Sequence, residues 1–146
     1  MNNEMKLIFD ANTENESFAR IVVASFISRL NPTIDVLTDI KTAVSEAVTN
    51  CIVHAYPMNP GKIELGVKIC DCNVEITIQD NGIGIDNIEQ ARMPFYTSKP
   101  NSERSGIGFT VMEGFMDSVK VFSEKNKGTK VVMNKSIIGE NVQVGG

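Results

Sequence analysis

The chain has 146 residues, 42% hydrophobic and 22% charged, which is ordinary for one soluble globular domain. Its 14 basic and 18 acidic residues give a net charge of −4, and the basic residues are scattered, which argues against direct nucleic-acid binding. Without a bilayer-spanning apolar run or a signal pattern, we expect a cytoplasmic protein with no membrane anchor. Cys51, Cys70 and Cys72 are odd in number, which favours reduced thiols over a disulfide framework or a zinc site.

The first part of the chain predicts a strand followed by two helices. Residues 5–11 alternate loosely, as in a strand, and residues 15–30 have apolar side chains at helical spacing. The apolar positions that indicate this first helix are Phe18, Ile21, Val22, Ser25/Phe26 and Leu30. A second helix is expected from about Thr33 to about Ala55, between Asn31-Pro32 and Tyr56-Pro57. Its expected buried stripe is Ile40, Val44, Ala47/Val48, Cys51 and Ala55.

The second part of the chain is richer in strands. Residues 62–69 and 74–79 alternate with period two around a turn at Asp71. A long stretch over 81–105, with a short helical piece near 88–92, precedes a helix over about 108–116. Strands follow over about 118–123 and 128–137. Hairpin-linked strands predict an α+β fold, a two-layer sandwich with helices on one face of a mixed, mostly antiparallel sheet. We expect one domain over 1–138 and a flexible tail over 139–146.

Polar side chains stand where apolar ones would be expected. Glu46, Asn50 and His54 are four residues apart on the second helix, beside its buried stripe, and could coordinate a metal and accept a proton. On the evidence of this helix alone, an ordinary amphipathic boundary is the favoured interpretation. Asp80 continues the core-facing parity of the preceding strand, and a buried carboxylate there needs hydrogen-bond donors, such as the exocyclic amine of adenine. A turn-initiating aspartate before Asn-Gly is the simpler alternative.

Two short glycine runs complete the pattern. Gly82 and Gly84 follow Asp80, and Gly106 and Gly108 precede the apolar third helix, whose N-terminal amide groups favour a phosphate. Neither run is a dinucleotide fingerprint or a P-loop, because the G-x-G-x-x-G and G-K-[ST] patterns are absent. Together with Asn50 they predict a nucleotide site made of three parts.

These motifs resemble those of the superfamily that includes gyrase, the Hsp90 chaperones, histidine kinases and MutL, whose ATP-binding fold is of the Bergerat type. Glu46-Ala-Val-Thr-Asn50 resembles its N box, and Asp80-Asn-Gly-Ile-Gly84 and Ser105-Gly-Ile-Gly108 resemble its two glycine boxes. The resemblance implies that Glu46 is a catalytic base, Asn50 a ligand of Mg²⁺ and Asp80 the reader of adenine. It implies that Gly82, Gly84, Gly106 and Gly108 form the backbone cradle for ATP and that Ser105 also binds ATP.

A narrower resemblance is to the anti-sigma serine kinases of spore-forming Gram-positive bacteria. The matching segments are Asn15–Arg20, Ser45–Asn50, Phe95–Pro100 and Glu103–Phe109. This resemblance implies a homodimer that uses ATP and Mg²⁺, sequesters a sporulation sigma factor (sigma F) and phosphorylates a serine of an anti-anti-sigma protein. It places Thr97, Ser98 and Arg104 in or beside the ATP lid, Thr129 near the adenine and Arg20 at a partner contact.

Three other functions fit parts of the pattern. A histidine kinase would need a dimerisation module, and the first expected strand begins at about Met5, which leaves no room for one. A nucleotide-gated binding module needs ATP but no base, so Glu46 distinguishes it from a kinase. A clamp of the gyrase or Hsp90 type fits least, because it needs a second domain to reach the γ-phosphate.

Overall fold

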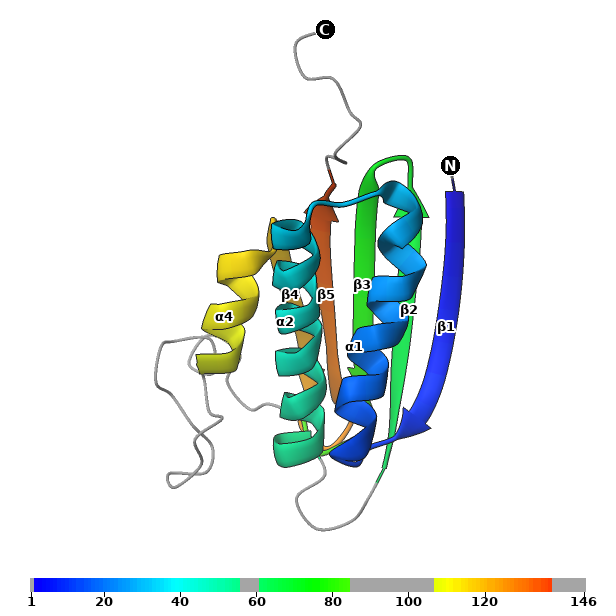
Figure 1. The fold of residues 1–146 in the computed structure, drawn as a ribbon. Coiled ribbons are helices and arrows are strands. Elements are labelled where there is room, and N and C mark those ends of the chain that lie inside the picture. Colours follow the sequence, from blue (N-terminus) through cyan, green and yellow to red (C-terminus); the bar gives the residue numbers. More distant parts are fainter. Residues whose placement is uncertain (1, 56–60, 85–106, 138–146) are drawn as a thin grey trace, which may run out of the picture.

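The computed structural model describes residues 2–55, 61–84 and 107–137, which form five strands and three α-helices (Figure 1). The strands are β1 (Asn2–Asp10), β2 (Lys62–Cys70), β3 (Asn73–Asp80), β4 (Ser118–Glu124) and β5 (Gly128–Ser136). The α-helices are α1 (Glu14–Ile27), α2 (Ile34–Asn50) and α4 (Ile107–Phe115). A 3₁₀ turn, η1 (Ser28–Leu30), follows α1, and a π-helical turn, η2 (Cys51–Ala55), follows α2.

The strands form one sheet in the order β1-β2-β3-β5-β4, and every described pair is antiparallel. The α+β class is therefore confirmed, although the sheet is antiparallel throughout rather than mixed. The reason is topological. Strands β3 and β4 are connected through α4 and run in the same direction, but β5 inserts between them, so these two parallel strands never become neighbours.

All three helices cover the same face of the sheet, and α2 lies between α1 and α4 (Figure 1). The apolar alternation of the strands points to these helices, as in β2, where Ile63, Leu65, Val67 and Ile69 are buried. One continuous core results. None of the helices in the described ranges is both long and apolar enough to cross a membrane.

Helix α2 follows its prediction closely. Its N-cap is Thr33, whose hydroxyl oxygen accepts a hydrogen bond from the Val36 N–H (3.3 Å). Every residue of the expected stripe is buried. The sequence pattern did not reveal the change of helix type after Asn50. The π-helical turn contains one more residue per hydrogen-bonded ring than an α-helix, so His54 does not simply continue the line of Glu46 and Asn50.

Helix α1 is confirmed, but its buried face is not the full set of apolar positions that indicate it in the sequence. Ala19, Val23 and Ile27 are buried, whereas Phe18 is 49% exposed and Ile21 is 58% exposed. Two apolar lines run side by side on this helix, and the one with the smaller side chains lies against the sheet. Large apolar residues therefore remain on the outer face of α1, where they bury little area.

Candidate nucleotide-binding site

Asp80, the last residue of β3, is 3% exposed and faces the helices, as predicted. Its Oδ1 atom accepts hydrogen bonds from the backbone N–H groups of Gly82 (2.9 Å) and Thr129 (3.2 Å). Its Oδ2 atom accepts a hydrogen bond from the thiol of Cys51 (3.4 Å from Sγ), at the end of α2. The carboxylate thus joins β3, β5 and the C-terminal end of α2.

Burial raises the pKa of the Asp80 carboxyl, and the hydrogen bonds from Gly82, Cys51 and Thr129 oppose this shift. Burial also raises the pKa of the Cys51 thiol well above its ordinary value, and the Asp80 carboxylate adds to the rise. Cys51 is therefore a neutral S–H donor. Because an ionised carboxylate only accepts hydrogen bonds, a ligand group that complements Asp80 must be a donor, as the amine of adenine is.

Helix α2 presents Glu46 and Asn50 one turn apart, about 6 Å along its axis. The Nδ2 atom of Asn50 is buried and has no hydrogen-bond partner among the described residues. Leaving a buried amide donor unpaired costs free energy, which an anionic oxygen of a ligand would recover. The carboxamide oxygen is a suitable ligand for a hard cation. No group of three or more His, Cys, Asp or Glu in the described ranges could hold a metal ion.

Close backbone contacts surround Gly82 and Gly84, at positions where a side chain would not fit. A Cβ at Gly82 would lie 2.2 Å from the carbonyl oxygen of Ala55. Gly84 has φ +76°, and its Cβ would lie 2.2 Å from the carbonyl oxygen of Glu124. Between them, the N–H of Ile83 donates to the Ala55 carbonyl (3.0 Å). Both glycines thus bring the end of β3 against η2 and the β4–β5 turn, while their contact with a nucleotide stays a prediction.

Thr129 reaches the site because Gly128 packs directly on Asp80. Gly128 has φ +104°, and a Cβ there would lie 2.1 Å from the Asp80 carbonyl oxygen. The Thr129 hydroxyl lies 2.8 Å from the Ser123 hydroxyl, which donates to the Gly128 carbonyl (3.1 Å). Since the Ser123 proton is used in that way, Thr129 donates to Ser123. This chain of bonds orients the Thr129 side chain beside the carboxylate.

Known proteins are similar to this chain over most of its length. The family described as "Histidine kinase-like ATPase domain" matches residues 9–135. The anti-sigma F factor of Clostridium perfringens (strain SM101) is 59% identical over 138 residues, which cover 94% of this chain and 99% of that protein. Those of Geobacillus thermodenitrificans (57%; 94% of each chain) and Clostridium kluyveri (56%; 91% of this chain and 94% of that one) are similarly related. The chain belongs to the anti-sigma F factors, within the histidine kinase-like ATPase family.

Solved structures share the fold. The RsbU and RsbW domains of a Mycobacterium tuberculosis protein superpose with a TM-score of 0.68 at 16% identity, over 97% of this chain and 35% of that longer one. The catalytic domain of the histidine kinase ThkA superposes with a TM-score of 0.57 at 19% identity, over 91% of this chain and 96% of that one. Both superpositions show that these proteins share the overall fold of this chain.

In this anti-sigma F factor family member, the predicted partner-contact residue Arg20 is tied to the helix that carries the predicted base. Its guanidinium lies 3.7 Å from the carboxylate of Glu16 and 3.3 Å from the hydroxyl of Ser17. On α2, the Ser45 hydroxyl donates a hydrogen bond to the same Glu16 carboxylate. Arg20 is thus connected through the Glu16 side chain to Ser45, the residue that precedes Glu46.

The part of the site that lies outside the described residues comprises Thr97, Ser98, Arg104, Ser105 and Gly106. Gly108 is the second residue of α4, which packs beside α2. The second glycine box therefore stays a prediction, apart from the helix that follows it.

Three residues of the site were missed from the sequence. Cys51 was expected only to be buried, although its position directly after Asn50 was a signal. Gly128 was visible as a glycine after the polar turn at 124–127, but nothing local indicated that it packs on Asp80. No local sequence pattern indicated that Ser123 belongs to the site, because its pairing with Thr129 depends on the register of β4 and β5.

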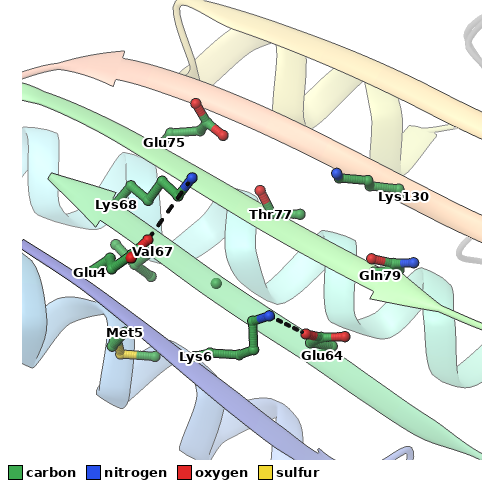
Figure 2. Close-up of a pocket in the computed structure, with 11 residues that line it drawn as sticks. Glu4, Met5, Lys6, Glu64, Val67, Lys68, Glu75, Thr77, Gln79 and Lys130 are labelled. Atoms are coloured by element: carbon green, nitrogen blue, oxygen red, sulfur yellow. Dashed lines mark ion pairs between the residues drawn. The ribbon is translucent and has the colours of Figure 1, made fainter. Parts of the chain in front are cut away.

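The opposite face of the sheet has a shallow hollow of about 400 Å³, which Figure 2 shows in close-up. It lies over Gly66, which has no side chain to fill the space, and ion pairs cross it between Lys6 and Glu64 (2.9 Å) and between Lys68 and Glu4 (3.9 Å). This hollow is not the nucleotide site, because the Asp80 side chain points to the helix-covered face.

Proposed function

We propose that the protein is an ATP- and Mg²⁺-dependent serine kinase that also sequesters a sporulation sigma factor of the sigma F type. In this proposal it acts as a homodimer and phosphorylates a serine of an anti-anti-sigma protein. The observation that carries the nucleotide assignment is the buried Asp80 carboxylate, held as an acceptor at the end of β3. The names of the relatives, anti-sigma F factors, support the sigma-factor partner.

The described residues suit the two ends of such a ligand. Asp80 would accept the adenine amine, with the Thr129 side chain beside it. Asn50 would offer its carboxamide oxygen to Mg²⁺ and its unpaired Nδ2–H to a phosphate oxygen. One carboxamide suffices on the protein side, because Mg²⁺ usually keeps several waters and takes its other ligands from substrate phosphates. We propose contacts from the lid residues Thr97, Ser98 and Arg104, and from the backbone at Gly82, Gly84, Ser105, Gly106 and Gly108.

Bound ATP with Mg²⁺ would supply the phosphoryl group and neutralise the charge that develops on transfer. Glu46 would accept the proton of the substrate serine hydroxyl as the seryl oxygen forms its bond to phosphorus and ADP leaves. Its place one turn before Asn50 would hold the base close to the phosphate end of the nucleotide. On the partner side, Arg20 would present a cation whose direction is set by Glu16.

The test of this function incubates the purified protein with ATP labelled at the γ-phosphate and the anti-anti-sigma protein. Acid-stable label on a serine is the expected result. Acid-labile label would indicate a histidine kinase, and no label with intact sigma-factor binding would indicate a binding module. Either outcome would overturn the proposed serine kinase.

Variants separate the roles of the two α2 residues. Glu46→Ala and the isosteric Glu46→Gln should abolish transfer and keep ATP binding, whereas Asn50→Ala should lose Mg²⁺-dependent ATP binding. Glu75→Gln, on the opposite face of the sheet, is the matched control and should change neither. A Glu46→Gln protein that still phosphorylates its partner would rule out Glu46 as the base.

A further inference from the structure

We propose that Cys51 is a positioning residue that aims the Asp80 carboxylate at the adenine amine, and so contributes to the choice of adenine over a 6-oxopurine base. The inference rests on the proposed function, because it assumes that a nucleotide binds with its base at Asp80. It concerns a residue that the resemblance to known families did not assign.

The two oxygens of Asp80 are held differently. Oδ1 accepts from two backbone N–H groups, those of Gly82 and Thr129, which occupy both of its lone pairs. Oδ2 accepts one hydrogen bond from the described residues, the one from the Cys51 thiol. One lone pair of Oδ2 therefore remains for a ligand donor, and the position of the thiol determines where that lone pair points.

Cys51 is suited to this role by its place in the fold. It is 5% exposed and is the first residue of η2, so packing of the helix end fixes its side chain relative to the sheet. As a neutral thiol it donates to the carboxylate without adding charge, and donation to the ionised form favours that form. By contrast, Cys70 and Cys72 are exposed, at the β2–β3 turn.

The consequence is selectivity between purines. Adenine presents an amine donor at the position where hypoxanthine presents a carbonyl acceptor. The oriented Asp80 carboxylate accepts a hydrogen bond from the adenine amine. With hypoxanthine, the carboxylate oxygen would face a carbonyl oxygen, and neither atom can donate. A site built to hydrogen-bond one group rejects the analogue that lacks it. Without the Cys51 donor, the carboxylate has one fewer bond that fixes its plane, and part of this discrimination should be lost.

The experiment measures the dissociation constants of ADP and of inosine diphosphate by calorimetry on the full chain. Cys51→Ala should weaken ADP binding about three- to tenfold, the effect of one modest hydrogen bond, and leave inosine diphosphate binding unchanged. Cys51→Val, which fills the space but has no donor, should behave in the same way. Cys51→Ser retains a donor and should restore the wild-type ratio of the two constants. Cys70→Ala is the matched control and should change nothing.

Two results would overturn the inference. One is wild-type affinity for ADP in Cys51→Ala and Cys51→Val. The other is an equal weakening of both nucleotides, which leaves the ratio of the two constants unchanged and which a purely structural role would produce. Urea unfolding of each variant verifies that the folded protein is being compared. Wild-type protein that binds neither nucleotide would instead overturn the proposed nucleotide site, so the two failures are distinguishable.

Discussion

The contact between Gly82 and the end of η2 predicts that Gly82→Ala destabilises the protein even without a nucleotide. The new Cβ would lie 2.2 Å from the carbonyl oxygen of Ala55 and 2.6 Å from its carbonyl carbon. Non-bonded carbon contacts are favourable only at about 3.5 Å or more, so the two backbones must separate by about 1 Å. That separation breaks the 3.0 Å hydrogen bond from the Ile83 N–H to the Ala55 carbonyl.

The magnitude follows from these two effects. Overpacking costs about 1–3 kcal/mol, and a lost backbone hydrogen bond about 1 kcal/mol, so the free energy of unfolding should fall by about 2–4 kcal/mol. Because the chain has no Trp, urea unfolding is best followed by circular dichroism. With a denaturant slope of about 2 kcal/mol per molar, the midpoint should fall by about 1–2 M.

Gly114→Ala is the matched control for this substitution. Gly114 lies in α4, and a Cβ there meets nothing within 4 Å. Alanine is the better helix former, so this variant should gain about 0.5–1 kcal/mol. If Gly82→Ala unfolds at the wild-type midpoint without nucleotide, the packing role is refuted, and a loss of ATP binding alone would assign Gly82 to the ligand.

Two further predictions concern the charged groups. Burial raises the pKa of Asp80, so its carboxylate takes up a proton at a higher pH than an exposed aspartate does. The ADP affinity measured by calorimetry should therefore decline as the pH falls through that raised pKa, and Asp80→Asn should bind ADP weakly at every pH. An ADP affinity of the wild type that does not change with pH would contradict the role of Asp80. In the absence of nucleotide, the same shift makes the contribution of this carboxyl to stability greatest below its unfolded-state pKa, and this contribution is lost as the pH rises through the folded-state pKa. Ser45→Ala removes the donor to Glu16, and should weaken anti-anti-sigma binding by up to about fivefold, less than Arg20→Ala does. Equal surface-plasmon-resonance affinities for Ser45→Ala and wild type would show that Arg20 needs no such support.

The sequence by itself determined the helix and the strands that have one buried apolar face and one exposed polar face. The core stripe of α2 and the alternation of β2 and β3 were predictable, because each has one apolar face and one polar face. The burial of Asp80 followed from the same parity. The buried face of α1 was not determined in this way, because that helix has two adjacent apolar lines, and only tertiary packing selects the one with Ala19, Val23 and Ile27.

The tertiary structure decided how the site is held together. Asp80 is bound by Cys51, 29 residues away, and by Thr129, 49 residues away, and both contacts require β5 to pair with β3 and the end of α2 to reach the sheet. No local pattern encodes that strand order, because side-chain periodicity reports which face is buried and not which strand is the neighbour. A buried carboxylate was therefore predictable from the residues of β3, but the identity of its donors depended on the fold.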